Sequence, residues 1–216
     1  EDLFVDAESA LKWLKTQDEI DPDKVILLGH SEGALVALRL ATKENFVAGV
    51  VLLAGPAKTG EETLIWQGEK ISETITGFNK FLLKLLRIDV AKSQRKTLEK
   101  IKSSSEDSFR IQGQRVNAKW MREFISHDPK SDLKKTEIPV LAITGSNDIQ
   151  VDPKDLQTMK SMVSSEIEIH EIDGLTHLLR EDNEDKGLQG YRKQVKQPVA
   201  PRLMERLTEW LFRKTA

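Results

Sequence analysis

The sequence of 216 residues contains no cysteine, which excludes a disulfide framework, thiolate-bound zinc, an iron–sulfur cluster and a cysteine nucleophile. It also has little net charge, because 33 lysine and arginine residues are offset by 35 aspartate and glutamate residues. Such a balance argues against a general nucleic-acid or anionic-membrane surface. No apolar run approaches the roughly 18–20 residues of a membrane span. We therefore expect a soluble globular protein, either cytoplasmic or exported.

The hydrophobic pattern predicts alternating helices and strands at both ends of the chain. Apolar residues at three- and four-residue spacing predict helices, and short apolar or alternating runs predict strands. The predicted helices cover 3–14, 34–41, 153–163 and 201–213, and the predicted strands cover 25–28, 47–53, 139–143 and 166–172. A strand, a tight turn, a helix and a second strand form a parallel βαβ unit. We therefore predict an α/β fold with a parallel sheet flanked by helices.

A block in the middle of the chain interrupts this alternation. Residues 61–128 keep helical spacing over several stretches and contain no clear strand, which predicts a helical cap inserted into the core. The core is then expected in two parts, 1–60 and 129–216. Within the block, residues 80–102 combine many basic side chains with apolar ones. We expect a solvated cap face there, with a membrane or acidic-substrate surface as the alternative.

Residues 29–33 read Gly-His-Ser-Glu-Gly and match the G-x-S-x-G pattern where a predicted strand meets a predicted helix. Such a nucleophile elbow holds its serine in a strained turn above the carboxyl end of the sheet, and its glycines relieve crowding between strand and helix. N–H groups at the start of the helix point toward the same place. We therefore interpret Ser31 as a nucleophile, with a glycine-rich turn that does no chemistry as the alternative.

A serine hydroxyl needs a base to take its proton, and the sequence offers four histidines. His30 lies inside the turn, His170 lies within a predicted strand, and His127 closes the middle block. His177 lies in the loop after the last predicted strand, at the sheet edge where an elbow serine would need its base. We predict that His177 is this base rather than an ordinary surface histidine.

The base in turn needs a carboxylate that fixes its tautomer and stabilises the imidazolium. Asp148 follows the third predicted strand and therefore lies near the same sheet edge. Asp152 is the nearest rival, but it directly precedes a proline and is expected to cap the next helix. With Asp148 preferred as the acid, the order along the chain is Ser31, Asp148 and then His177, which is the order of the α/β-hydrolase triad.

The sequence gives no support for a metal or another cofactor. It has no His-x-x-x-His pair, and its acidic residues do not follow the spacing of a calcium loop. The only glycine-rich turn between a strand and a helix carries the serine, which argues against dinucleotide binding. We therefore expect neither a metal nor a cofactor.

Five stretches resemble α/β-hydrolase-fold serine hydrolases of the carboxylesterase and serine-aminopeptidase-like branch, which is related to dienelactone hydrolases. They read VILLGHSEGALVAL, VVLLAGP, IPVLAITGSNDIQVDP, GLTHLLR and VAPRLMERLTEWL, and together they span most of the chain. The resemblance implies that Ser31 is the nucleophile, Asp148 the acid and His177 the base. It also implies that the backbone N–H of Glu32 is one oxyanion-hole donor.

The resemblance further implies that the block at 61–128 covers the active site as a cap. Structural packing is the default for Trp66 and Gln67, with a place at the substrate pocket as the alternative, and His30 is the third candidate for that pocket. In this fold, earlier strands complete the sheet and carry the second oxyanion-hole donor. We therefore expect about 100 further N-terminal residues, or a second chain or swapped partner in their place.

The predicted function is hydrolysis of carboxylic esters with small or medium acyl chains through an acyl-enzyme. A small-molecule ester is the expected partner. A peptidase or thioesterase with the same triad is an alternative, because both classes use the same nucleophile and base. A binding module that has kept the fold without turnover is the alternative from a different class.

Overall fold

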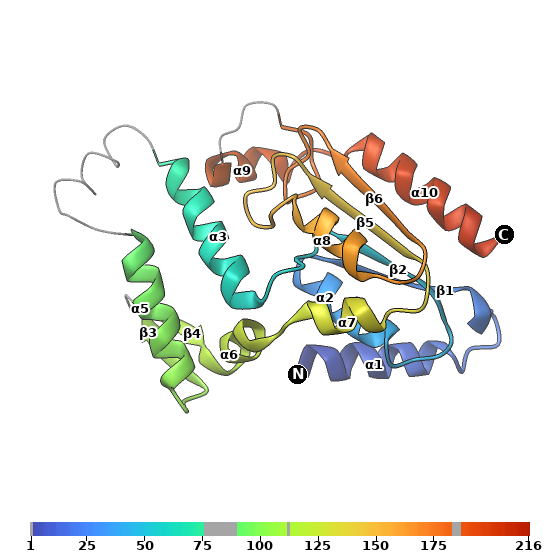
Figure 1. Cartoon of the computed structure of the whole chain (residues 1–216), viewed down its shortest axis with the longest axis horizontal. Coiled ribbons are helices and arrows are strands. Elements are labelled where there is room, and N and C mark those ends of the chain that lie inside the picture. Colours follow the sequence, from blue (N-terminus) through green and yellow to red (C-terminus); the bar gives the residue numbers. More distant parts are fainter. Residues whose placement is uncertain (1, 76–89, 112, 183–186) are drawn as a thin grey trace.

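The computed structural model describes residues 2–75, 90–111, 113–182 and 187–216. Its main sheet has four parallel strands in the order β1-β2-β5-β6 (Figure 1). They are β1 (Val25–His30), β2 (Val47–Leu53), β5 (Val140–Gly145) and β6 (Ile167–Ile172). The predicted α/β class and the four predicted strands are therefore confirmed. Because the strands are parallel, their carboxyl ends meet at one edge of the sheet.

Helices cover both faces of this sheet. One face carries α1 (Asp2–Leu14), α2 (Glu32–Ala41), α7 (Pro129–Lys135) and α8 (Asp155–Met162), and the other carries α10 (Pro201–Thr215) (Figure 1). Side chains alternate along β2, so Val50 and Leu52 pack toward α2 and α8 while Val51 packs toward Trp210 of α10. Both sides of β2 are thus apolar, as expected for a parallel strand buried on two faces.

The middle block forms a separate layer beside the core (Figure 1). It contains α3 (Gly60–Glu73), α5 (Val90–Ser103), β3 (Ser108–Ile111), β4 (Gln114–Asn117) and α6 (Ala118–Ser126). Leu98, Ile101 and Ile125 form its own small apolar cluster. The expectation that this block has no strand was wrong, because β3 and β4 pair as an antiparallel hairpin. Each strand has only four residues, too few for a clear alternating pattern.

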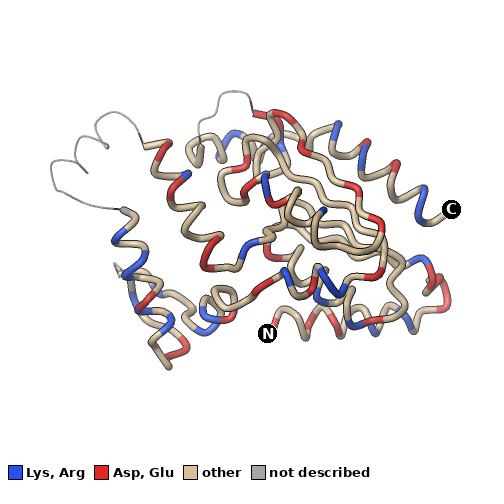
Figure 2. The backbone as a smooth tube through the Cα atoms, in the orientation of Figure 1, with Lys and Arg blue, Asp and Glu red and all other residues tan. Residues whose placement is uncertain are grey.

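The boundaries of the cap and the two core parts stay a prediction. Residues 76–89, which carry part of the expected helical stretch and the first part of the basic segment, lie outside the described residues. The described part of that segment is α5, along which Figure 2 marks the lysine and arginine positions, and the side chains at these positions are exposed. Its buried residues Leu98 and Ile101 point the other way, into the cap cluster. This arrangement is that of a solvated helix face.

The remaining elements are short. They are η1 (Pro22–Lys24), η2 (Gly187–Gly190) and α9 (Tyr191–Gln194), and the last two lie in the long connection between β6 and α10. In the described part of the chain, no helix is both long and apolar enough to cross a bilayer.

Candidate active site

The turn between β1 and α2 places Ser31 above the carboxyl end of the sheet. Its backbone has φ 56° and ψ −120°, a conformation that L residues rarely adopt and that a nucleophile elbow imposes. A Cβ at Gly29 would lie 2.0 Å from the carbonyl oxygen of Gly33, so only glycine fits at position 29. A Cβ at Gly33 would meet open space. The expectation that both glycines relieve crowding is therefore wrong for Gly33, where a side chain would have room.

The structure brings Ser31, His177 and Asp148 into one hydrogen-bonded chain. With the Nδ1 tautomer of His177, the Ser31 hydroxyl donates to Nε2 at 3.1 Å. Nδ1–H donates to the Asp148 carboxylate, at 2.9 Å to Oδ2 and 3.1 Å to Oδ1. His177 is only 4% exposed and Asp148 only 3% exposed, so both groups interact away from bulk water, where hydrogen bonds are electrostatically stronger.

The loops after β5 and β6 lie against each other and so bring Asp148 to His177. Asn147 N–H donates to the carbonyl oxygen of Leu175 at 3.1 Å. A Cβ at Gly145 would lie 1.9 Å from the same oxygen, so this close approach requires glycine. The glycine was visible in the sequence, but the sequence did not show which loop it lies against.

Backbone N–H groups hold the Asp148 carboxylate in place. Its Oδ1 accepts from Gln150 N–H at 2.8 Å and from Val151 N–H at 2.9 Å. Together with His177, these donors satisfy a carboxylate that would otherwise be buried without partners. Asp152 contacts Lys58 instead of the histidine. As expected, Asp152 caps the turn that leads into α8, because its Oδ1 accepts from Lys154 N–H at 3.0 Å, although the N-cap position of the helix itself is Lys154.

Of the other three histidines, two lie away from Ser31 and His177, and His30 contacts His177. His170 pairs with Glu168 on the same strand, and His127 lies at the end of α6. His30 was expected at the substrate pocket, but its Nε2 lies 2.8 Å from the His177 carbonyl oxygen and its ring packs against the His177 ring. Burial lowers the pKa of His30, so the neutral form donates this bond.

The helix that follows Ser31 supplies the candidate oxyanion donor. Glu32 is the first residue of α2, so its N–H has no acceptor within the helix and lies at the positive end of the helix dipole. Its side chain extends to the cap, where Oε1 accepts from Trp120 Nε1 at 2.6 Å. The indole of Trp120 in turn stacks on Phe124 of the same helix, α6. The middle block therefore contacts the residue next to Ser31.

Trp66 and Gln67, the two residues of the middle block considered for the pocket, lie near the loop that carries Asp148. Trp66 lines an open groove of about 880 Å³ that Asp148 also lines. Gln67 instead donates from Nε2 to Gln150 Oε1 at 3.0 Å, and Gln150 Nε2 donates to the Tyr191 hydroxyl at 2.9 Å. Gln67 thus contacts the loop that holds Asp148. Sequence spacing carries no signal for such a contact.

A metal centre has no support in the described residues. Within those ranges, no group of three or more histidine, aspartate or glutamate side chains is placed to bind a metal. The chemistry that the site offers is nucleophilic attack by a hydroxyl next to an imidazole base.

Comparison with known proteins assigns the chain to a family. The family described as serine aminopeptidase, S33, matches residues 1–184, which is most of the chain. The chain belongs to this family. One relative, esterase EstD of Thermotoga maritima, is 29% identical over 98% of this chain and 48% of its own length. The chain therefore spans about half the length of the curated relative that it matches.

Solved structures place this member of the S33 family in the α/β-hydrolase fold. The α/β hydrolase GrgF from Penicillium sp. sh18 has a TM-score of 0.58 at 14% identity, over 98% of this chain and 71% of that one. Est1E from Butyrivibrio proteoclasticus, solved with ferulic acid bound, has a TM-score of 0.54 at 14% identity, over 90% of this chain and 68% of that one. At such identities the likeness concerns the fold alone.

Proposed function

We propose that the protein is a serine hydrolase that cleaves carboxylic esters of small or medium acyl chains through an acyl-enzyme. The observation that carries the proposal is the unbroken hydrogen-bond chain from the Ser31 hydroxyl through His177 to Asp148. Ser31 lies in a strained turn that destabilises the folded state. Such strain is expected where the turn has to present the hydroxyl to a substrate. The esterase name of its relative from Thermotoga maritima adds support for esters.

The first half-reaction transfers the acyl group to the enzyme. Ser31 Oγ attacks the ester carbonyl carbon while its proton passes to His177 Nε2, and the negative charge forms on the carbonyl oxygen. The Glu32 N–H donates to that oxygen. His177 then gives the proton to the leaving alkoxide oxygen as the C–O bond breaks. The alcohol departs, and the acyl group stays on Ser31.

Water completes the cycle by the same route. His177 takes a proton from water as the water oxygen attacks the acyl carbon, and it returns the proton to Ser31 Oγ when the ester bond to the enzyme breaks. The Asp148 carboxylate does not change its protonation. It keeps Nδ1 protonated and stabilises the imidazolium that forms in both half-reactions.

A further strand along β1 is the second element of the proposal. In the described residues, β1 pairs only with β2 and forms one edge of the sheet. Leu28 of this edge strand is 50% exposed, and an apolar, unpaired edge is a surface that proteins normally cover. We expect the covering strand, from the same protein or from a partner chain, to carry the second oxyanion-hole donor. One such donor contributes about 3 kcal/mol to transition-state stabilisation, or roughly a hundredfold in rate.

Amide or thioester cleavage is the second candidate function, and the description of the matching family as serine aminopeptidase favours the amide. Ester, amide and thioester cleavage are distinguished by the turnover of matched substrates that share one acyl group and differ only in the leaving group. We expect the ester to react fastest, with short and medium acyl chains preferred over long ones. The Ser31→Ala variant must lose this turnover with all leaving groups.

The ester proposal fails if aminoacyl amides turn over faster than esters of the same acyl group. The serine hydrolase proposal as a whole fails if Ser31→Ala retains the parent's turnover. A matched control is Ser161→Ala, since Ser161 is an exposed serine of α8 whose hydroxyl donates to the Thr158 carbonyl oxygen and not to the imidazole. This variant is expected to keep most of the activity.

A further inference from the structure

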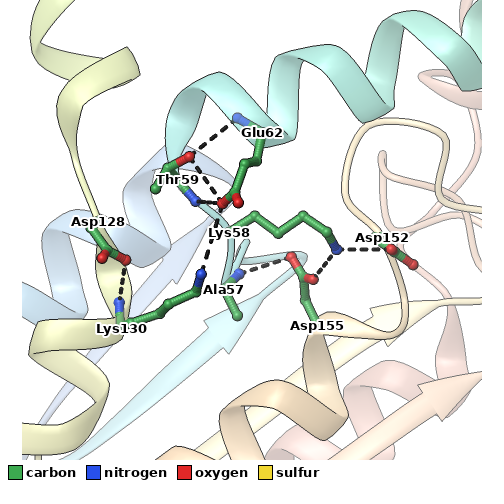
Figure 3. Close-up of polar contacts among 8 residues, drawn as sticks. All are labelled: Ala57, Lys58, Thr59, Glu62, Asp128, Lys130, Asp152 and Asp155. Atoms are coloured by element: carbon green, nitrogen blue, oxygen red, sulfur yellow. Dashed lines mark hydrogen bonds and ion pairs between the residues drawn. The ribbon is translucent and has the colours of Figure 1, made fainter.

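Lys58 lies in the short connection that leads from β2 to the first cap helix, α3. Its Nζ donates to Asp152 Oδ2 at 2.8 Å and also to Asp155 Oδ1 (Figure 3). The neighbouring Ala57 N–H donates to the other oxygen of Asp155 at 2.9 Å. We call Lys58, Asp152 and Asp155 the Lys58 clamp. The clamp joins residues about one hundred positions apart in the chain.

The charged groups of the clamp are largely buried from solvent. The Asp155 side chain is 3% exposed, and those of Asp152 and Lys58 are 13% and 30% exposed. Burial raises the pKa of Asp155. The pKa of Lys58 is raised overall. Burial by itself lowers this pKa, but the hydrogen bonds to Asp152 and Asp155 raise it by more. Removing the charge of Lys58 would leave the buried carboxylates without a partner, and removing a carboxylate would leave Lys58 with one partner fewer. The paired arrangement of the three side chains is therefore favoured over a broken one.

The clamp is also directly linked to the segment that holds the candidate catalytic acid. Asp152 follows Val151 in the chain, and the N–H groups of Gln150 and Val151 donate to Asp148 Oδ1. The segment 148–155 is thus fixed near its start by His177 and toward its end by Lys58. The backbone donors that orient the Asp148 carboxylate lie between these two points.

The other side of the clamp is the base of the cap. Thr59, next to Lys58, caps α3 together with Glu62, whose carboxylate also pairs with Lys130 at 3.8 Å (Figure 3). Gly60 N–H donates to the carbonyl oxygen of His127 at 3.2 Å. The segments that enter and leave the cap are therefore tied together within a few residues of Lys58.

We propose that Lys58 is a positioning residue that couples the base of the cap to the loop carrying Asp148, and so aligns Asp148 with His177. The inference rests on the proposed serine-hydrolase function for its effect on turnover. Lys58 does not touch the reacting atoms. It acts through Asp152 and the Gln150 and Val151 N–H groups, so a shift of the cap base changes the orientation of the acid.

The test compares Lys58→Met with Lys58→Arg and with Lys130→Met in the natural protein that contains this chain. Lys58→Met keeps the length of the side chain and removes the charge, and Lys130→Met removes a charge at the cap base without touching the acid loop. We expect Lys58→Met to lower kcat about ten- to a hundredfold at little change in KM, because misalignment affects the reaction more than binding. Lys58→Arg should restore most of kcat, and Lys130→Met should stay near the parent.

Hydrogen exchange gives a readout that does not depend on turnover. In a Ser31→Ala background, Lys58→Met should speed exchange of the Gln150 and Val151 amides, while Lys130→Met should not. Should Lys58→Met fail to fold, Asp152→Asn serves in its place, since it leaves the buried Lys58–Asp155 pair intact. A folded clamp variant with parent-like kcat and parent-like exchange at both amides overturns the proposal. If Lys58→Met speeds exchange of the Gln150 and Val151 amides but the parent protein shows no turnover, the result supports the clamp and rejects the serine-hydrolase function.

Discussion

The imidazole of His30 packs against the imidazole of His177, with ring centroids 4.9 Å apart, and its Nε2 lies 2.8 Å from the His177 carbonyl oxygen. The residue before the proposed nucleophile therefore contacts both the backbone and the ring of the residue proposed as its base. Because Ser31 follows His30 directly, the same turn positions both of the proposed reacting groups. From this contact we predict that His30 aligns His177, while its expected place at the substrate pocket stays a prediction.

Replacing His30 should reduce turnover while the protein stays folded. His30→Ala removes a hydrogen bond and a ring contact from His177, each worth about 1 kcal/mol, so we expect kcat/KM to fall by up to about thirtyfold. The measurement is ester turnover, with thermal unfolding as a check on folding. The control is His170→Ala, whose imidazole pairs with Glu168 away from Ser31. Equal effects of the two variants would contradict the role given to His30.

The two glycines of the elbow should respond in opposite ways to alanine. Gly29→Ala places a Cβ 2.0 Å from the Gly33 carbonyl oxygen, so we expect it to lower the free energy of unfolding by more than about 3 kcal/mol or to prevent folding. Gly33→Ala meets open space within a helix and should raise that free energy by up to about 1 kcal/mol. Urea denaturation of both variants measures the difference. A stable, unperturbed Gly29→Ala protein would show that strand and helix do not approach as described.

The hydrogen bond from Trp120 Nε1 to Glu32 Oε1 should hold α6 against the turn that carries Ser31. Trp120→Phe keeps an aromatic ring that can stack on Phe124 and removes only the Nε1 donor, so we expect about 1–2 kcal/mol less protection of α6 against local opening. Hydrogen exchange of the α6 amides measures it. Glu32→Gln is the matched control, because its amide oxygen still accepts and should keep most of the protection. If Trp120→Phe leaves exchange in α6 unchanged, the bond does not fasten the cap.

Two histidines should make the protein sensitive to acid. Burial lowers the pKa of both His30 and His127 below the model-peptide value of 6.5. A lowered pKa means that the unfolded chain takes up the proton first as the pH falls. The stability associated with the neutral imidazoles is therefore complete above pH 6.5 and is lost as the pH falls through the lowered pKa values.

Urea denaturation from pH 7 down to about pH 4 tests this, because linkage sets the slope of stability against pH. The double variant His30→Gln/His127→Gln cannot take up these protons, so its free energy of unfolding should fall less steeply than that of the parent. Parallel curves for the parent and the double variant would rule out this source of acid sensitivity.

The sheet and its flanking helices were predictable because one physical signal governs each of them. Val47–Leu53 is a continuous apolar run, and it forms β2 with those same bounds because both of its faces are buried. The hairpin of β3 and β4 escaped prediction for the opposite reason. It is short and largely exposed, so burial imposes little hydrophobic pattern on its sequence.

The candidate triad was predictable from chain order and from the rule that parallel strands end at one edge. The residues that support it were not. The unforeseen supporting contacts are those of His30 with His177, Lys58 with Asp155, and Gln67 with Gln150. Each joins loops or helices that are distant in sequence, and spacing along one element says nothing about which partner a second loop brings near.

The most direct test of the account is labelling with a fluorophosphonate, which reacts with a serine only when a neighbouring base activates it. In the natural protein that contains this chain, the account predicts covalent labelling at Ser31, no labelling in Ser31→Ala, and labelling at least about a hundredfold slower in His177→Ala. Labelling that occurs on another serine, or its absence from a folded parent protein, would contradict the central claim that Ser31 is an activated nucleophile.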